Sequence, residues 1–599
     1  MNPKLSLSSL IIGAALASFA LPSNACFTVI VGKNLSKTGE IMVGHNEDNG
    51  NRIMSNQYYV PPMTHKKGEL LTFEASAAKI PQVEKTNGYW WEQTLHPAGY
   101  SYSDGFFNDH GVLITSNNCN LTIEKDEKTT DGGIGYGIRR LLAERATSAR
   151  DGVKLAIQLV SKYGYRHQGR TYTIADKNEA WQLALLKGGR YLARKVGDNE
   201  VTLMSNAFSL GKVDLNDKNN VIYSPDLVTH AIEKGTYKPA KAGDYSDFNF
   251  RDAYQLPERI NADRNTYRVR TGLLKLTGKK IDDPLQFPTA IKLDRKLSVG
   301  DVREILRQTN PWDERKSGWY HEYFKDPSNG GTFDSAVYVL RKDPRTSYTW
   351  RTSGRPDSQF SYPQFMLAGP SAGQSYLSVE QGKEAQFRSR PDQFDYGPNR
   401  TVFTFINHQN ILDWNQKELK DFPAKQKSFE DRMNKDFQTA LTRADKMIPV
   451  SEDKAMEKMR EFNADSFNRA LGATAAELDR NNKYTIIIGA NELPLGGEGT
   501  VKVTLLSSKG FDATKLDKSK TYFGDGYPDN SIHYNNKRAQ PKSVEFIDVN
   551  GDKLKDAVIE FPIKGATEYT FPNVLTQLYL WSVVDGKPVV AFDTVKIKK

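Results

Sequence analysis

Cys26 is the residue of this sequence best placed for covalent chemistry, because a protease cleavage signal stands directly before it. Small residues at Ser23 and Ala25, with Asn24 between them, fit the slot of a signal peptidase. A cut after Ala25 would give Cys26 a terminal α-amine, whose pKa of about 7.7–8.0 lets it accept the thiol proton near neutral pH. The resulting thiolate attacks carbonyl carbons and forms an acyl-enzyme. We therefore expect Cys26 to act as a nucleophile with its own amine as the base.

Residues 1–25 are predicted to be a secretory signal peptide. Lys4 precedes an apolar run from Leu10 to Leu21, and Pro22 ends that run. The run is too short to cross a bilayer, and no later run of about 18 apolar residues follows it, so we expect no membrane span. The sequence therefore predicts export to the periplasm or the medium, with signal peptidase as a maturation partner.

A β-hairpin is predicted to bring polar side chains back to Cys26. Phe27–Val31 and Ile41–Val43 are rich in strand-forming residues, and a turn-rich segment lies between them. Antiparallel pairing about that turn sets Cys26 opposite about residue 47. The polar string His45–Asp48 then lies beside the nucleophile, either as part of an active site or as a solvated strand end.

An ordered series of segments carries a family resemblance: Ala25–Lys33, Gly44–Asp48, Asn108–Val112, Arg139–Arg150, Ile174–Trp181, Ser205–Asn206, Arg268–Arg270 and Gly354–Pro356. Together they resemble PepD-like dipeptidases, which are cysteine members of the N-terminal nucleophile (Ntn) hydrolases, related to choloylglycine hydrolases and penicillin V acylases. The resemblance covers about residues 26–370. It implies an αββα fold and hydrolysis of a small amide.

The resemblance also implies roles for single residues. Cys26 matches the nucleophile, and Asp48 matches the acid that contacts its α-amine. Asn206 matches the asparagine that donates to the oxyanion, and Asn118 falls where acylases place a second one, although PepD-like dipeptidases often carry an acid there. His45 stands where the acylases have an arginine, and a histidine is not always charged near pH 7. We expect His45 to support the thiol by a hydrogen bond, and a conventional Cys–His pair is the alternative.

Three functions are compatible with these residues. The first is a dipeptidase that works through a thioester, and the second is an acylase on N-acyl amides such as penicillin V or bile-salt-like compounds. The third is a non-catalytic envelope-binding protein with a decayed hydrolase domain. Intact Cys26, Asp48 and Asn206 argue against decay. We expect a small peptide or N-acyl amide as the substrate, and no cofactor is required by this chemistry.

Two arginines are candidates for substrate binding. Residues 211–295 are polar and are predicted to form an irregular excursion over the site. Within it, Arg268 and Arg270 are expected to meet a substrate carboxylate, because guanidinium groups pair with carboxylates through two parallel hydrogen bonds. Surface ion pairs with nearby aspartates are the alternative.

The predicted fold class is α+β, an αββα Ntn-hydrolase sandwich (residues 26–420) with a helical segment (421–482) and a C-terminal β-sandwich domain (483–599). Apolar spacing predicts helices over Gly135–Ala146, Ser148–Gly164 and Val302–Gln308. Strands are predicted over Thr171–Ile174, Ala180–Leu186, Arg190–Val196, Val201–Ser205 and Ser335–Arg341. Trp350–Pro363 is expected to be a loop, because glycine and proline punctuate it.

The last part of the chain is rich in predicted strands: Thr485–Gly489, Thr500–Leu506, Ser543–Asp548, Ala557–Phe561, Glu568–Phe571 and Gln577–Val583. Between two of them, one loop carries oxygen ligands at a calcium-loop spacing, on Asp548, Asn550, Asp552 and Asp556. The loop lacks the full twelve-residue pattern and its terminal Glu. Bound structural calcium is therefore an open prediction.

Composition excludes several other classes. The chain has 599 residues, 38% of them apolar and 26% charged, which suits a globular protein of more than one domain. Its two cysteines exclude a disulfide scaffold and a Cys-rich metal site, and Cys119 is expected to be a small buried hydrophobic residue. The net charge of +10 is dispersed, whereas nucleic-acid binding needs a concentrated basic stripe, so no nucleic-acid partner is expected.

Overall fold

The structure is a computed structural model that describes residues 25–48, 54–72, 77–95, 101–309, 326–329, 331–374, 377–385, 401–414, 416–525, 538–568, 570 and 574–599. The predicted signal peptide lies outside the described residues, apart from Ala25. Helices and strands are mixed throughout the described chain, as the predicted α+β class requires. Among the described helices, not one combines the length and the apolar character needed to span a membrane.

A six-stranded antiparallel sheet contains the strand that begins at the expected cleavage site. Its order is β12-β1-β2-β14-β15-β16. The strands are β1 (Ala25–Val31), β2 (Ile41–Asp48), β12 (Val201–Met204), β14 (Thr332–Leu340), β15 (Tyr348–Ser353) and β16 (Tyr362–Phe365). β1 and β2 form the predicted hairpin, and Cys26 pairs with Glu47, which confirms the predicted register.

A second sheet of eight strands has the order β13-β11-β10-β9-β8-β7-β6-β3. Its strands are β3 (Met54–Val60), β6 (Tyr89–Leu95), β7 (Ser101–Asn108), β8 (Leu113–Asn118), β9 (Gly169–Ala175), β10 (Ala180–Leu186), β11 (Tyr191–Val196) and β13 (Val221–Tyr223). A separate two-stranded ribbon pairs β4 (Leu70–Leu71) with β5 (Ile80–Pro81). The strands predicted over residues 171–196 are confirmed within two residues at each end.

The two sheets face each other across one apolar layer. Ile30 and Val43 of the six-stranded sheet pack there with Phe107 and Leu113 of the eight-stranded sheet. Because side chains alternate along a strand, Val29 and Val31, on either side of Ile30 in β1, point to the opposite face. Each sheet therefore has one face toward its partner and one face toward helices.

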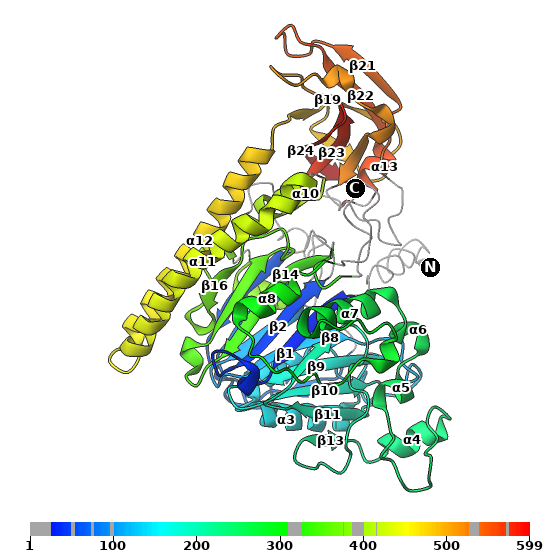
Figure 1. Ribbon diagram of the computed structural model, residues 1–599, viewed down its shortest axis with the longest axis vertical. Helices are drawn as coiled ribbons and strands as arrows, with labels where there is room; N and C mark the ends of the chain where they lie inside the picture. Colours follow the sequence, from blue (N-terminus) through cyan, green and yellow to red (C-terminus); the bar gives the residue numbers. More distant parts are fainter. Residues whose placement is uncertain are drawn as a thin grey trace, which may run out of the picture.

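Helices α2 (Ile138–Arg145) and α3 (Ala149–Tyr163) pack on the outer face of the eight-stranded sheet. Ser148 caps α3 by accepting a hydrogen bond from the backbone N–H of Asp151, as its position before an apolar-periodic run predicts. Gly164 ends the helix at a φ of 74°, where a side chain would be strained. Figure 1 shows α3 on the far side of this sheet from α8.

Helices α7 (Asp263–Thr277) and α8 (Val299–Leu306) pack on the outer face of the six-stranded sheet. A Cβ atom on Gly44 of β2 would lie 2.7 Å from Val302, so glycine allows α8 to approach the strand closely. The helix predicted over 302–308 is therefore present, but it begins three residues earlier, at a Ser298 capping box.

The prediction that residues 211–295 are irregular is wrong for part of this segment. It contains α4 (Leu227–Glu233), α5 (Phe250–Tyr254), α6 (Pro257–Ile260) and α7. Val269, Leu273 and Leu276 form a narrow buried stripe on α7, spaced by four and three residues. Arginine, lysine and threonine occupy many of the remaining positions and mask this periodicity in the sequence.

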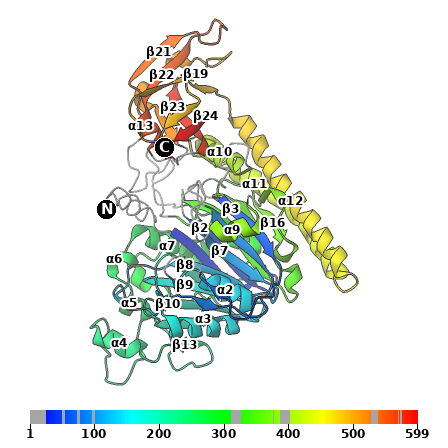
Figure 2. The same ribbon diagram turned by 180° about the vertical axis from the view of Figure 1, so that it is seen from behind.

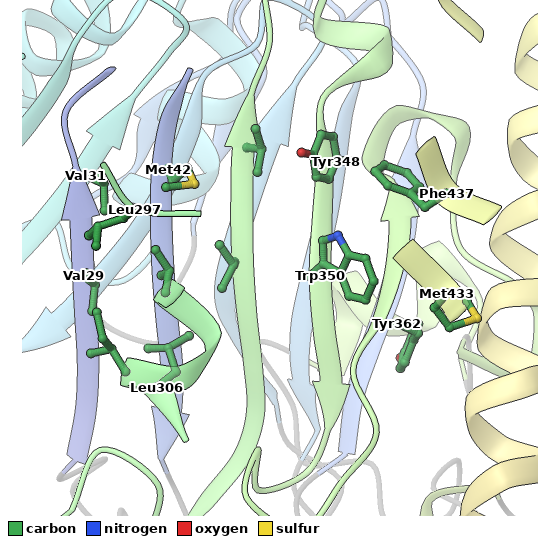
Figure 3. Packing of buried hydrophobic residues seen from close by; sticks show 14 of the residues in the cluster. Val29, Val31, Met42, Leu297, Leu306, Tyr348, Trp350, Tyr362, Met433 and Phe437 are labelled. Carbon is green, nitrogen blue, oxygen red and sulfur yellow. The ribbon is translucent and has the colours of Figure 1, made fainter. Parts of the chain in front are cut away.

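The prediction of a loop over Trp350–Pro363 is also wrong at both ends. Trp350 lies inside β15, and Pro363 lies in β16, the last strand of the sheet. Proline is tolerated on an edge strand because its missing N–H is not needed there. Figure 3 shows the Trp350 ring facing Phe437 of the long helix α11, and their ring centres are 6.2 Å apart.

Three helices connect the sheets to the C-terminal part of the chain: α10 (Thr401–Trp414), α11 (Gln416–Met447) and α12 (Glu452–Asn481), and the short α9 (Val379–Ala385) precedes them. The last two of the three confirm the helical segment predicted over residues 421–482. They run side by side, and their buried residues Phe429, Met433 and Phe437 pack against the six-stranded sheet (Figures 1 and 2).

The C-terminal part has its own core between two four-stranded sheets. The strands are β17 (Ile486–Ile488), β19 (Thr500–Leu505), β22 (Asp556–Pro562) and β21 (Ser543–Ile547) in one sheet, and β18 (Glu492–Pro494), β24 (Lys587–Lys598), β23 (Val574–Val584) and β20 (Tyr522–Asp525) in the other. The predicted strand Glu568–Phe571 is wrong for its described residues, because residues 568 and 570 form a turn after α13 (Ile563–Thr567). Tyr579 donates a hydrogen bond to Asn407 of α10, which joins this part to the helices.

Candidate active site

The alternation of β2 divides the polar string predicted to surround Cys26 between the two faces of its sheet. Cys26 Sγ donates a hydrogen bond to Glu47 Oε2 at 3.3 Å, on the face toward the eight-stranded sheet. Asn46 points the other way and donates to the carbonyl of Leu306 in α8 at 2.9 Å. Asp48 is two residues after Asn46 on the same strand, so its side chain points to the same face as that of Asn46. The thiol and the predicted amine partner are therefore reached from different sides of one strand pair.

On the inner face, the thiol begins a chain of buried polar groups. Glu47 Oε2 also contacts His45 Nε2 at 3.1 Å, and His45 Nδ1 contacts Thr28 Oγ1 at 2.7 Å. Thr28 Oγ1 donates to Asn117 Oδ1 on β8 at 2.7 Å, which links the two sheets. His45 therefore contacts the thiol's carboxylate partner, which fits the predicted supporting role.

On the outer face, Asn206 and Arg268 hold the backbone of the nucleophile. The nitrogen of Cys26 donates to Asn206 Oδ1 at 2.5 Å. In the chain described here this nitrogen is the peptide amide that follows Ala25, and it occupies the place of the predicted α-amine. Arg268 donates to Asn206 Oδ1 at 2.7 Å and to the carbonyl of Cys26 at 3.0 Å. These contacts fix both ends of residue 26.

The amide of Asn206 is oriented so that its nitrogen is available to an incoming group. Its Oδ1 accepts two hydrogen bonds, and its Nδ2 is buried without a hydrogen-bond partner among the described residues. The backbone of Asn206 is held at both ends, by Asn265 Oδ1 at 3.2 Å and Arg259 Nε at 2.5 Å. A buried donor without an acceptor costs free energy, so a fixed orphan donor beside a nucleophile suits an oxyanion.

Asp48 is fully buried, with two hydrogen-bond donors and one arginine near its carboxylate. Asn329 Nδ2 donates to it at 2.7 Å, Thr332 Oγ1 donates to its other oxygen, and Arg268 lies 3.9 Å away. Burial raises the pKa of Asp48 from its ordinary value of 3.8 to about 7, although Arg268 and the two hydrogen bonds lower it. Asp48 is thus poised to titrate near neutral pH.

We expect hydrolysis by the processed chain to rise with pH through about 7, because an ionised Asp48 pairs with Arg268, which binds the Cys26 carbonyl and Asn206. Loss of activity on the acid side, measured as kcat/KM against pH, should follow two protons, because the α-amine must also be neutral, and Asp48→Asn should leave only the limb of the amine. The raised pKa also means that Asp48 favours folding when it is protonated. The contribution of protonated Asp48 to the free energy of unfolding is complete below pH 3.8 and is lost as the pH rises through about 7. A pH profile unchanged in Asp48→Asn would contradict this assignment.

The second predicted oxyanion residue, Asn118, lies on the face of β8 toward the helices. Its Oδ1 accepts from the backbone N–H of Asn120 at 3.2 Å, and its carbonyl accepts from Arg259 at 3.1 Å. Its neighbour Asn117 points into the layer between the two sheets, where the Cys26 thiol also lies. The Nδ2 of Asn117 is buried without a hydrogen-bond partner among the described residues. Leu113 lies in the core between the sheets, and Asn117 is four residues later on the same strand, so both side chains point to the same face. This alternation could have identified Asn117 from the sequence. Oxyanion binding by Asn118 stays a prediction.

The structure separates the two arginines predicted to bind substrate. Arg268 is fully buried and contacts Cys26, as described above. Arg270 lies on a different face of α7, where it donates to the carbonyls of Ile281 at 3.1 Å and Asp282 at 2.6 Å. Contact of either with a substrate carboxylate stays a prediction.

Sequence reasoning did not identify a buried arginine pair behind β8. Arg139 and Arg170 both donate to Ser116 Oγ, at 3.2 and 2.9 Å. Burial alone would lower the pKa of Arg170, but the nearby Tyr136 ring and the Cys26 thiol are among the groups that raise it. Arg170 therefore adds positive potential near the nucleophile.

The predicted calcium loop is closed by its own hydrogen bonds. Asp548 accepts from the backbone N–H groups of Gly551 at 2.7 Å and Lys553 at 2.9 Å. Asp552 accepts from the N–H of Leu554 at 2.8 Å, and Asn550 from that of Asp552 at 3.1 Å. Asp556 is buried and accepts from Ser507 and Val549 in the same way. These bonds account for the loop conformation, and calcium binding stays a prediction.

Cys119, the second cysteine, is a buried member of an apolar cluster with Ala184 and Phe208, as predicted. Burial raises the pKa of its thiol, which keeps it protonated. Both cysteines are thiols in this structure.

Comparisons with known proteins each match about half of this chain. Residues 25–318 match the family model described as Peptidase family C69. A probable dipeptidase of Latilactobacillus sakei is 27% identical over 322 residues, and a probable dipeptidase B of Streptococcus pyogenes is 30% identical over 315 residues. These matches cover 52% and 51% of this chain, and they span 63% and 61% of the relatives' own lengths.

Solved structures give a weaker likeness. A mutant of the conjugated bile acid hydrolase from Clostridium perfringens covers 57% of this chain and 92% of its own, at 10% identity and a TM-score of 0.26. A second variant of that hydrolase covers 55% of this chain and 89% of its own, at 10% identity and a TM-score of 0.23.

Proposed function

We propose that this chain, whose residues 25–318 match peptidase family C69, is an exported N-terminal cysteine hydrolase that cleaves dipeptides through a thioester. The observation that carries the proposal is the convergence at residue 26. The thiol of Cys26 donates to Glu47, the nitrogen that becomes the α-amine donates to Asn206, and the Nδ2 of the same Asn206 is a buried donor without a hydrogen-bond partner among the described residues. The helices outside both sheets fit the αββα order of the Ntn hydrolases, which supports the same reading.

The first half of the proposed reaction forms the thioester. The α-amine takes the proton of the Cys26 thiol, and the sulfur forms a bond to the carbonyl carbon of the first substrate residue. The carbonyl oxygen becomes an oxyanion, and the Nδ2 of Asn206 donates to it. When the C–N bond breaks, the protonated α-amine returns its proton to the leaving amine. The second residue of the dipeptide departs as a free amino acid.

The second half releases the first residue. A water molecule gives one proton to the α-amine and forms a bond to the thioester carbon, and the same amide donor holds the second oxyanion. The C–S bond then breaks, the sulfur recovers its proton from the amine, and the first residue leaves as a carboxylic acid. Asp48 acts indirectly, because it and Asn206 are both bound by Arg268, which holds the Cys26 carbonyl.

A substrate panel on the processed chain tests the proposal. Mass spectrometry of the exported protein should find a chain that starts at Cys26. This form should hydrolyse dipeptides faster than N-acyl amino acids and penicillin V. Preference for the N-acyl compounds would favour the acylase, and a chain that starts at Cys26 but hydrolyses none of them would favour the binding protein.

A further inference from the structure

Glu47 stands where a negative charge opposes the proposed chemistry. Its Oε2 lies 3.3 Å from Cys26 Sγ, and only 6% of the residue is exposed. A carboxylate at this distance in a buried site disfavours the thiolate, because like charges repel strongly where water is excluded. The α-amine already supplies the base in the proposed mechanism. The carboxylate of Glu47 lies beside the sulfur, where a positively charged group of the substrate would meet it.

The stereochemistry of a dipeptide supplies a partner for this charge. The carbonyl carbon that the sulfur attacks is bonded to the Cα that carries the substrate's α-ammonium group. Standard bond lengths place that nitrogen about 2.5 Å from the carbonyl carbon. The sulfur must approach the same carbon to about 3–3.5 Å. A carboxylate next to the sulfur is consequently within reach of a charge-assisted hydrogen bond to the ammonium group, which needs about 2.7–2.9 Å.

The arrangement around Glu47 fixes its position for such a contact. His45 Nε2 lies 3.1 Å from the same carboxylate, and Thr28 holds the other side of that ring at 2.7 Å. Asp334 of β14 lies opposite Glu47 in the β14–β2 strand pair, and it forms an ion pair with Arg351. These residues come from neighbouring strands of one sheet, so the carboxylate is held on rigid elements.

We propose that Glu47 binds the α-ammonium group of the substrate and thereby selects compounds with an unblocked amino terminus. This inference rests on the proposed function and names the substrate group that the site recognises. The bound ammonium offsets the charge of Glu47, so the thiolate is favoured when the correct substrate is present. An N-acyl amide brings no positive charge to this carboxylate.

The test compares alanyl-alanine with lactoyl-alanine, in which a hydroxyl replaces the ammonium group at nearly the same size. The processed wild-type chain should hydrolyse alanyl-alanine faster. Glu47→Gln should lower kcat/KM for alanyl-alanine by about 100-fold, in the range measured for buried charge pairs. Its kcat/KM for lactoyl-alanine should be unchanged or higher. Glu40→Gln, on the same hairpin near its turn, is the matched control and should change neither value.

Other outcomes distinguish the alternatives. An equal loss on both substrates in Glu47→Gln would overturn the inference and make Glu47 a proton acceptor for the thiol. Equal wild-type rates on the two substrates would overturn it and leave the proposed hydrolase in place. If the wild-type chain hydrolyses neither compound nor any other dipeptide, the proposed function itself fails. Calorimetry of alanyl-alanine binding to Cys26→Ala, with and without Glu47→Gln, gives a readout independent of turnover, and equal affinities would also reject the inference.

Discussion

Cys26→Ala is expected to abolish hydrolysis by the processed chain while the protein stays folded. The change removes the only atom of the protein that forms a covalent bond to substrate in the proposed reaction, so kcat should fall by at least about 1,000-fold. Cys26 is buried next to polar groups, and alanine fits the same strand position without adding volume. Turnover of dipeptides and thermal unfolding, measured on the same preparation, check the two parts of this expectation.

Two further variants sharpen the result. Cys26→Ser should keep at most weak activity, because a hydroxyl is a poorer nucleophile beside an amine of pKa about 8. Cys119→Ala is the matched control, since Cys119 lies in a separate apolar cluster, and it should retain activity within a few-fold. Hydrolysis at the wild-type rate by Cys26→Ala would exclude the thioester mechanism.

Retention of Ala25 is expected to give a folded but inactive protein. An amide nitrogen is not basic near neutral pH, so Cys26 would lose the base that activates its thiol. In the uncut chain Ala25 pairs with Asp48 in the β1–β2 hairpin, so the uncleaved form keeps this strand pairing. The nitrogen of Cys26 is in place beside Asn206 and lacks only its basicity.

Two preparations measure this effect, one uncleaved before Cys26 and one that starts at Cys26. We expect about 1,000-fold more activity from the second, on the same dipeptide. Equal activity would reject the amine as base and promote His45 in a conventional Cys–His pair. His45→Gln separates the two readings further, since it keeps a hydrogen-bonding group but cannot act as a base. It should reduce the activity of the processed chain only modestly if the amine is the base.

The hairpin around Cys26 could be predicted from the sequence because its determinants are local. Two strand-rich segments and one turn fix the register, and the observed pairing of Cys26 with Glu47 follows directly. Because side chains alternate along a strand, Glu47 and Asp48 also point to opposite faces of the sheet. The family motif, read as a continuous string, does not show this. The motif alone suggests that Asp48 lies beside the thiol, whereas it lies on the opposite face with Arg268.

Other parts of the site depend on which segments stack in space. Asn117 faces Thr28 only because β8 crosses behind β1, and Arg170 is close to the thiol only through the pairing of β9 with β8. Neither position is marked by local composition. The sequence pattern misplaces Trp350 for a similar reason, since its strand is buried by the distant helix α11. Tertiary packing overrides a local signal in such cases.

The burial of Cys26 sets an order for the events of maturation. Cys26 is 1% exposed, and the residue before it already belongs to a paired strand. A protease needs several residues of extended, accessible chain, so it can reach the Ala25–Cys26 bond only before β1 docks or after it detaches. In the proposed pathway, cleavage and folding therefore compete. A precursor that folds first becomes a kinetic dead end, and the yield of active enzyme depends on the protease acting while the chain still emerges from the membrane.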